Sequence, residues 1–389
     1  MVRRHQRDEP FDIPCVDRGV ERDRDFDLRS VHERDPRAPS VSWTLDLSSR
    51  STFTQVQSVA ETLSELALAT GFSGVVRIDL AGEPLFTEAF GFADLRHGIL
   101  NAVDTRFGVA SGTKGLTALA VMSVIESGLL SLGTPARSVL GDDLSLIDDS
   151  VSVEHLLAHR SGIGDYLDES ELSDVNDYVM AVPVHQLAST ADYVQVLGGH
   201  PQVSSPGKRF AYNNSGFVIL ALILDRVTGQ RFEDIVHERV CVPAELTSTS
   251  FVRSDALAGD MAQGYLGAEG LRTNALHLPL LGSGDGGIFS TAIDTHKLRS
   301  ALFENRIVSA ESVRLMTRPR SDVPDEQMRY GLGLWIHAST SAVMLEGSDA
   351  GVSFRTVHDP AAAVTRTVLA NTSAGAWPIT REIDRLLGM

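Results

Sequence analysis

Lysine is scarce in this chain of 389 residues, because only Lys114, Lys208 and Lys297 occur among its 34 basic residues. The other basic residues are arginines, and arginine keeps its proton in proteins and cannot act as a base. A partly desolvated lysine can lose its proton and become a neutral amine. Each lysine is therefore a candidate for chemistry that the arginines cannot perform.

Cysteines and long apolar runs are also few. Cys15 and Cys241 lie in unlike settings, so we expect no disulfide between them and a buried thiol at Cys241. The chain has no run of 18 apolar residues, and its first 50 residues contain no apolar segment of signal-peptide length. These absences predict a cytoplasmic protein without a membrane span.

Positive charge is outweighed by negative charge, with a formal net charge of −17. Phosphates would be repelled by such a surface, which argues against nucleic acid or an anionic membrane as a partner. The sequence also lacks G-x-S-x-G, the signature of the α/β-hydrolase nucleophile. A small-molecule substrate is the partner that remains, and the sequence does not indicate an oligomeric state.

Two regions differ in composition. Residues 1–50 combine ten arginines and eleven acidic residues with few large apolar side chains, which predicts a disordered charged tail. Whether this tail belongs to the native product stays open. The remaining residues, 51–389, contain enough apolar side chains for one large domain.

Apolar periodicity predicts the elements of this domain. Helices are expected over 53–70, 111–127, 152–159, 186–197, 215–228, 231–240, 291–303, 309–316 and 378–387. Strands are expected over 74–80, 85–91, 330–337, 341–346, 352–357 and 364–371. Strands at both ends of the domain predict one sheet built from residues 51–125 and 284–389, with a mostly helical insert over 126–283.

One lysine follows a serine by three places at the start of an apolar helical run, in Ser111-Gly112-Thr113-Lys114. Positions i and i+3 share one face of a helix, so the Lys114 amine is expected to reach the Ser111 hydroxyl. Such a pair is a serine nucleophile with its base. The same spacing recurs in Ser205-Pro206-Gly207-Lys208, where proline and glycine predict a turn instead.

A second polar group, Tyr212-Asn213-Asn214, precedes an apolar helical run. A pKa of Tyr212 lowered by a nearby Lys114 would let the phenol relay protons, and Asn214 could orient the lysine or a substrate carbonyl. The structural alternative is a helix N-cap at Asn213 or Asn214 beside a packed tyrosine.

Two further patterns are weaker. His155 and His159 have the i, i+4 spacing of a zinc helix, but Leu156 occupies the place of the catalytic glutamate. We therefore interpret His159 as a helix end with local bonds. The glycine cluster over 282–287 lacks the spacing of a phosphate loop and predicts a tight loop near a site.

Together these motifs resemble the serine β-lactamase and penicillin-binding-protein superfamily, within its branch of class C β-lactamases, DD-peptidases and esterases. The resemblance covers about residues 53–389. It rests on the following stretches in this order: Ser111-x-x-Lys114, 156–162, Pro206-Gly207, Tyr212-x-Asn214, 286–291 and 330–335.

The resemblance implies an α+β fold of the β-lactamase/transpeptidase type, an antiparallel sheet flanked by helices with an inserted, mostly helical domain. It implies Ser111 as nucleophile, Lys114 as its base, and Tyr212 with Asn214 as the second catalytic element. No metal or organic cofactor is expected.

The family's third element is a basic residue, then Thr or Ser, then Gly, on a strand that lines the cleft. We place it at Ser348-Asp349-Ala350-Gly351, where a neutral serine and an acidic Asp349 stand. These residues would contact substrate, and the backbone N–H of Gly351 would join that of Ser111 as an oxyanion hole. An aspartate repels the carboxylate that this element holds in the family.

The sequence therefore favours a serine hydrolase acting through an acyl-enzyme on Ser111, with an esterase on neutral esters or amides as the preferred form. A β-lactamase, D-specific peptidase or DD-carboxypeptidase is the enzymatic alternative. A non-catalytic binding or sensor protein on the same fold is the third.

Overall fold

Two segments far apart in the sequence form neighbouring strands of the main sheet. The computed structural model describes residues 50–169 and 172–387, which fall within one compact unit, Ser42–Met389. In it, β1 (Gly74–Leu80) pairs antiparallel with β13 (Val364–Ala370), from Gly74 opposite Ala370 to Leu80 opposite Val364. The predicted sheet from both ends of the domain is thus confirmed, whereas the predicted tail over 1–50 lies outside the described residues apart from Arg50.

The main sheet has eight strands in the order β2-β1-β13-β12-β11-β10-β9-β8. Every pairing in it is antiparallel. The remaining strands of this sheet are β2 (Glu83–Phe90), β8 (Ser321–Val323), β9 (Met328–Tyr330), β10 (Trp335–His337), β11 (Val343–Asp349) and β12 (Val352–Asp359).

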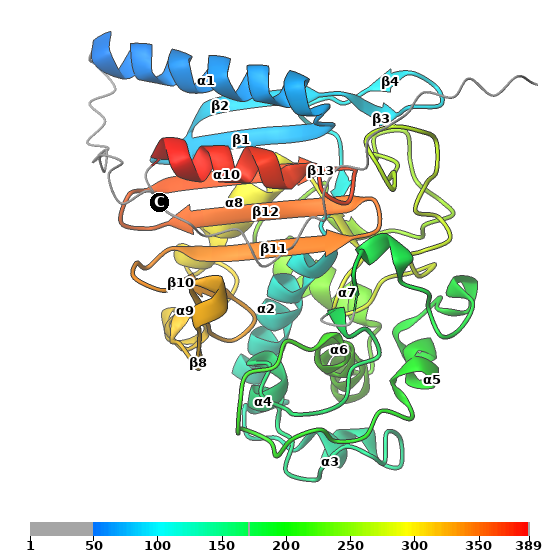
Figure 1. Cartoon of the computed structure of the whole chain (residues 1–389). Helices are drawn as coiled ribbons and strands as arrows, with labels where there is room; N and C mark the ends of the chain where they lie inside the picture. Colours follow the sequence, from blue (N-terminus) through cyan, green and yellow to red (C-terminus); the bar gives the residue numbers. More distant parts are fainter. Residues whose placement is uncertain (1–49, 170–171, 388–389) are drawn as a thin grey trace, which may run out of the picture. The chain divides into compact units, whose positions relative to one another are not determined.

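Helices cover both faces of this sheet. On one face lie α1 (Arg50–Thr70) and α10 (Ala376–Leu387), which pack side by side across the strands in Figure 1. Their apolar side chains join those of β1 and β13 in one buried cluster that includes Leu63, Ile78 and Ile379. On the other face lie α8 (Ala292–Phe303), α9 (Ala310–Thr317) and α2 (Thr113–Glu126).

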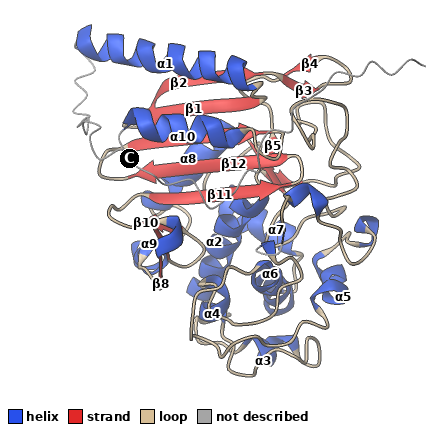
Figure 2. Ribbon diagram, viewed as in Figure 1, coloured by secondary structure: helices blue, strands red, loops and turns tan. Residues whose placement is uncertain are grey.

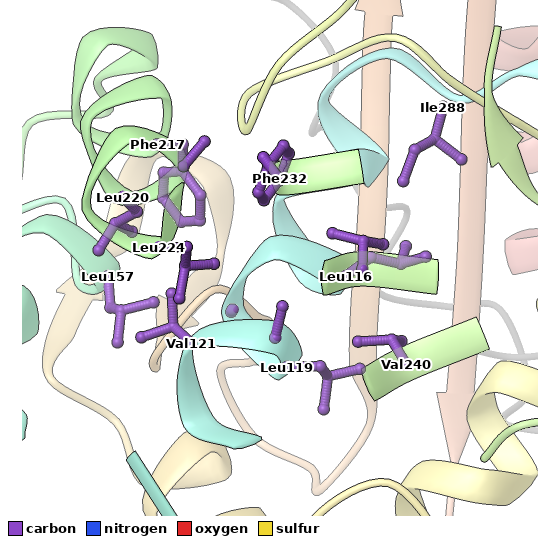
Figure 3. Close-up of a cluster of buried hydrophobic side chains, with 14 of the residues drawn as sticks. Leu116, Leu119, Val121, Leu157, Phe217, Leu220, Leu224, Phe232, Val240 and Ile288 are labelled. Carbon is purple, nitrogen blue, oxygen red and sulfur yellow. The ribbon is translucent and has the colours of Figure 1, made fainter. Parts of the chain in front are cut away.

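Helix α2 links the sheet to the helical part of the molecule (Figure 2). Nearly all of its residues are buried, as expected of a helix that is apolar all round. In Figure 3, Leu116, Leu119 and Val121 of α2 lie among side chains from other helices, including Phe217 and Phe232. This packing holds the start of α2 in a fixed place, and the candidate nucleophile comes directly before it.

The helical part contains α3 (Ala136–Leu140), α4 (Val153–Leu157), α5 (Val194–Leu197), α6 (Asn214–Thr228) and α7 (Phe232–Val236). Short strands accompany it: β3 (Phe92–Asp94) pairs with β4 (Ile99–Leu100), and β7 (Ile288–Ser290) lies between β5 (Phe107–Gly108) and β6 (Ser250–Phe251). The antiparallel sheet flanked by helices that the sequence predicts is confirmed.

Two predicted elements differ in the structure. The helix over 186–197 breaks into short 3₁₀ turns and the four-residue α5, because Asp192 accepts bonds from the Ala188 N–H and the Ser189 hydroxyl and competes with helical bonding. The strand over 330–337 is two strands, β9 and β10. Gly333 between them has φ +72°, and a Cβ there would lie 2.2 Å from Cβ of Ala118 on α2.

Candidate active site

Ser111 and Lys114 lie within hydrogen-bond distance at the start of α2. Ser111 belongs to a 3₁₀ turn, Ala110–Gly112, that leads into α2, and Lys114 is the second residue of the helix. The Lys114 Nζ donates to Ser111 Oγ over 2.7 Å. The predicted contact is thus present, although it spans a 3₁₀ turn and the first helical residues. The rival pair forms a turn at the surface, where Lys208 donates its backbone N–H to the Ser205 carbonyl.

The backbone before Ser111 is strained. Ala110 has φ +43°, in the left-handed region that costs a residue with a Cβ about 1–2 kcal/mol. The Val109 N–H donates to the Ile288 carbonyl of β7, and the Gly112 N–H donates to the Val109 carbonyl. These bonds hold the turn in place and set where the Ser111 side chain enters the cleft.

The Lys114 ammonium is buried and has three acceptors. Besides Ser111 Oγ, it donates to Asn214 Oδ1 over 2.7 Å and to the Asp285 carbonyl over 3.0 Å. Burial lowers the pKa of Lys114 below its ordinary value, and the nearby carboxylates, Asp285 first, partly oppose this. The neutral amine, which can accept a proton, is therefore reached at lower pH than for a surface lysine.

Asn214 orients this lysine, as one of the sequence-based alternatives predicts. Its Nδ2 donates to the Leu167 carbonyl over 2.9 Å and to Glu169 Oε1 over 3.0 Å, which leaves Oδ1 for Lys114. The neighbouring Asn213 is the N-cap of α6, because its Oδ1 accepts the Gly216 N–H over 2.7 Å. Asn213 is thus the N-cap of the helix, and Asn214 is the residue that contacts Lys114.

Tyr212 lies beside the pair, with Lys114 Nζ 5.0 Å from the centre of its ring and its phenol hydrogen-bonded to Ser111. The prediction that Lys114 lowers the pKa of Tyr212 is wrong. Burial raises this pKa well above its ordinary value, the charge of Glu169 adds to the rise, and the bond with Ser111 opposes it. Tyr212 is therefore a neutral phenol that can donate a proton in a hydrogen bond.

His155 in α4 and His159 just after it have structural contacts. His155 shares a capping box with Ser152, at the N-terminus of the helix. His159 is buried beyond its end, where Nδ1 accepts the Asn213 N–H over 3.1 Å and the ring lies 4.3 Å from that of Tyr212. The interpretation of His159 as a helix end with local bonds is wrong for its side chain, because the ring bonds Asn213, which is distant in the sequence, and packs against the Tyr212 ring.

The third motif lies four residues earlier in the sequence than predicted. A Cβ on Gly347 would stand 2.2 Å from the Val109 carbonyl and 2.7 Å from the Ser111 nitrogen, so only glycine fits against this turn. The glycine of the motif is therefore Gly347, in Leu345-Glu346-Gly347 of β11. Leu345 takes the place of the basic residue, so this register also lacks a cation.

With the glycine of the motif at Gly347, the second N–H donor of the oxyanion hole is no longer that of Gly351. The Gly351 N–H donates to Ser373 Oγ over 2.8 Å and is not available. The Ala342 carbonyl, just before β11, accepts the His337 N–H of β10, so the backbone groups of Ala342 face the β10 edge of the strand. Backbone groups alternate in direction along a strand, and Ser348 lies an even number of residues after Ala342. The Ser348 N–H therefore points to the same edge, away from β12. Ser348 follows Gly347, so its N–H is the donor that can join that of Ser111.

Of the three residues predicted to contact substrate, two line the cleft and one does not. Ser348 and Asp349 line the cleft that leads to Ser111, which holds about 1110 Å³ of space, part of it open to solvent. Ala350 is buried, and its carbonyl accepts from Asn274 Nδ2 over 3.0 Å. Ala350 therefore contributes to the structure of the turn after β11 and not to the cleft surface.

Several acidic residues of the site have no motif in the sequence. Asp165 accepts the backbone N–H groups of Asn214 and Ser215 at the start of α6, and burial raises its pKa to about 6. Asp285 accepts from the Tyr166 hydroxyl over 2.5 Å, and burial raises its pKa too. Only the glycine cluster around Asp285 signalled this wall of the site, as a tight loop.

A family model described as Beta-lactamase matches residues 59–387. The chain belongs to the Beta-lactamase family. This family includes serine hydrolases of several kinds, and the geometry above is that of a serine beside a buried lysine. Among the described residues, no helix is both long and apolar enough to cross a membrane.

Two proteins similar to this chain have names that describe different functions. The putative penicillin-binding protein PbpX of Bacillus subtilis is 27% identical over 282 residues, which cover 72% of this chain and 65% of that protein. D-aminopeptidase of Brucella anthropi is 27% identical over 274 residues, which cover 69% of this chain and 49% of that protein. The chain thus spans less than two thirds of either relative.

A solved structure, a penicillin-binding protein from Bacillus halodurans, is 32% identical and superposes with a TM-score of 0.78, over 83% of this chain and 99% of that one. This similarity confirms the β-lactamase/transpeptidase fold that the sequence resemblance implies.

Proposed function

We propose that the protein is a serine hydrolase that forms an acyl-enzyme on Ser111 and acts on esters or amides without a carboxylate beside the scissile bond, with esters favoured. The observation that carries the proposal is the 2.7 Å contact between Ser111 Oγ and the buried Nζ of Lys114. Asn214 and the Asp285 carbonyl hold that nitrogen in place.

In the first half of the reaction, Ser111 Oγ attacks the substrate carbonyl, and its proton passes to the neutral Lys114 amine. The oxyanion that forms accepts the N–H groups of Ser111 and Ser348. The bond from the carbonyl carbon to the leaving group then breaks. The phenol of Tyr212 donates a proton to the leaving group, and Lys114 returns one to Tyr212.

In the second half, a water molecule attacks the acyl-enzyme and gives its proton to Lys114. The bond from the acyl carbon to Ser111 Oγ breaks, and the serine recovers its proton. The products are a carboxylic acid and an alcohol or amine.

A β-lactamase or D-specific peptidase is the alternative, and membership of the family supports it. The name of the D-aminopeptidase relative fits the peptidase form of this alternative. Against β-lactams stands the replacement of the basic residue of the third motif by Leu345 on β11. A chromogenic cephalosporin hydrolysed much faster than a short p-nitrophenyl ester would favour the alternative.

Active-site labelling tests the proposal directly. A fluorophosphonate probe should label the wild-type protein and the control Ser205→Ala, whose serine belongs to the rival surface pair, but not Ser111→Ala. Labelling of Ser111→Ala would refute the assignment. Absence of both labelling and turnover in the folded wild type would instead support a binding or sensor protein.

A further inference from the structure

More acidic than basic side chains line the cleft. Among the described residues that line it, Glu169, Asp285 and Asp349 are acidic, His277 is a histidine, and none is lysine or arginine. Lys114 lies at its base and is already held by three acceptors. Within the described part of the chain, neither Glu169 nor Asp349 forms an ion pair with a basic side chain. A ligand that enters therefore meets more carboxyl groups than cations, and Lys114 is a cation whose charge acts on Asp285 and Asp349.

Asp349 lies close to the reacting serine. Side chains alternate along β11, so Leu345, Gly347 and Asp349 share the face that packs against α2 and the Ser111 turn. The Cβ position of Gly347 is 2.7 Å from the Ser111 nitrogen, and Asp349 follows two residues later, about 6.6 Å along the strand. One Asp349 oxygen accepts its neighbour's Ala350 N–H over 2.7 Å, which fixes the carboxylate at the cleft wall.

Glu169 lines the same cleft from the loop that follows α4. Its carboxylate accepts from Asn214 Nδ2, and the same amide binds Lys114 through Oδ1. The charges of Glu169 and Asp349 act on each other. Aromatic side chains also line the cleft: Tyr166, Tyr178, Tyr193 and Phe289. Aromatic faces attract cations, so the apolar and acidic parts of the cleft favour the same charge.

From this arrangement we infer that the substrate carries a primary ammonium group within a few bonds of the scissile carbonyl, and that Asp349 and Glu169 recognise it. The inference rests on the proposed function and specifies its substrate class as aminoacyl esters or amides with a free amine. Asp349 and Glu169 would accept the N–H groups of the ammonium while Ser111 attacks the carbonyl.

The same contact would aid the reaction. The carboxylates that raise the pKa of Lys114 include Glu169 and Asp349. A substrate ammonium between them offsets their charge and adds a positive charge near Lys114, so the neutral amine becomes more favourable. An aminoacyl substrate would thus help to form the base that its own hydrolysis requires.

Two esters of nearly equal shape test the inference. Alanine methyl ester, as D and L enantiomers, carries an ammonium where methyl isobutyrate carries a methyl group. The wild-type kcat/KM should favour one alanine ester over methyl isobutyrate by about tenfold or more, the range expected of hydrogen bonds to charged groups. Added salt should reduce the preference.

Substitutions of Asp349 and Glu169 test whether these side chains cause the preference for the alanine ester. Asp349→Asn and Glu169→Gln should each reduce the preference about tenfold, measured in each variant as the ratio of kcat/KM for the alanine ester to kcat/KM for methyl isobutyrate. Asp104→Asn, at an exposed position outside the cleft, is the matched control and should leave the preference unchanged. Melting temperatures show that each variant folds, and the two variants serve as independent tests.

A wild-type preference for methyl isobutyrate, or an unchanged preference in both variants, overturns the inference and leaves the proposed hydrolase intact. If the protein hydrolyses neither ester, the inference is also overturned. Labelling of Ser111 by the fluorophosphonate then shows whether the acyl-enzyme chemistry has failed as well.

Discussion

Lys114 provides a sharp test of the proposed chemistry through the substitution Lys114→Arg. Arginine keeps a positive charge and enough N–H donors for Asn214 Oδ1 and the Asp285 carbonyl, so the buried acceptors retain partners. It cannot release its proton and accept that of Ser111. Loss of a general base typically costs about 10²–10⁴-fold in rate, and we expect kcat/KM to fall within that range.

The stability of this variant should change less than its activity. Lys114 is 2% exposed, so the larger guanidinium must displace neighbours, at a cost of about 1–3 kcal/mol in the free energy of unfolding. Initial rates with p-nitrophenyl butyrate report the activity, and thermal unfolding reports the stability. The matched control is Lys208→Arg in the exposed Ser205-x-x-Lys208 pair, which should match wild type in both.

The pH dependence separates a base from a structural cation. Because burial lowers the pKa of Lys114, wild-type kcat/KM should rise with pH as the amine loses its proton. Lys114→Arg should lose this rise. Activity of Lys114→Arg within about threefold of wild type would refute the role of Lys114, as would an equal loss in Lys208→Arg.

Three further predictions concern the rest of the cleft. Gly347→Ala places a Cβ against the Ser111 turn and should lower stability by about 1–3 kcal/mol and kcat/KM about 10²-fold. Gly133→Ala, where a Cβ meets no atom within 4 Å, should do neither, and equal effects would contradict the placement of the motif. Tyr212→Phe should slow a methyl ester more than a p-nitrophenyl ester, because only the methoxide leaving group needs a proton; equal losses would argue against the relay. Burial raises the pKa of Asp349 to about 7, so the preference for an alanine ester over methyl isobutyrate should grow between about pH 5.5 and 7.5 as this carboxylate ionises. A preference that falls over this range would contradict that role. The charged groups that face Asp349 are Glu169, Asp285 and Lys114.

Much of the fold could be predicted because the signals are local. The apolar and β-branched residues of β1 and β13, the apolar run of α2 and the apolar periodicity of α1 and α6 are properties of short segments. The errors arise where distant contacts override local preference. Gly333 ends a predicted strand because it packs on Ala118 of α2, and no pattern within the segment reports that contact.

The candidate site also contains some features that follow from the local sequence and others that depend on distant contacts. Ser111 and Lys114 are three residues apart, so their contact follows from local geometry, and Asn214 was found through a short motif. The predicted pKa of Tyr212 was wrong because burial and the charge of Glu169 depend on side chains brought there by folding. The sequence pattern places the third motif four residues late, because the glycine of the motif is defined by its contact with the Ser111 turn.

The sequence by itself determined the family, the serine and lysine pair and the lack of a cation in the third motif, because these depend on residue identity and short spacing. Only the tertiary structure decided which glycine touches Ser111, which backbone N–H faces the oxyanion, and how many carboxylates surround the cleft. Asp165 and Glu169 come from one loop, Asp285 from another, and Asp349 from the end of β11. Their combined electrostatic field exists only where the chain brings them together, and we propose that this field selects the substrate.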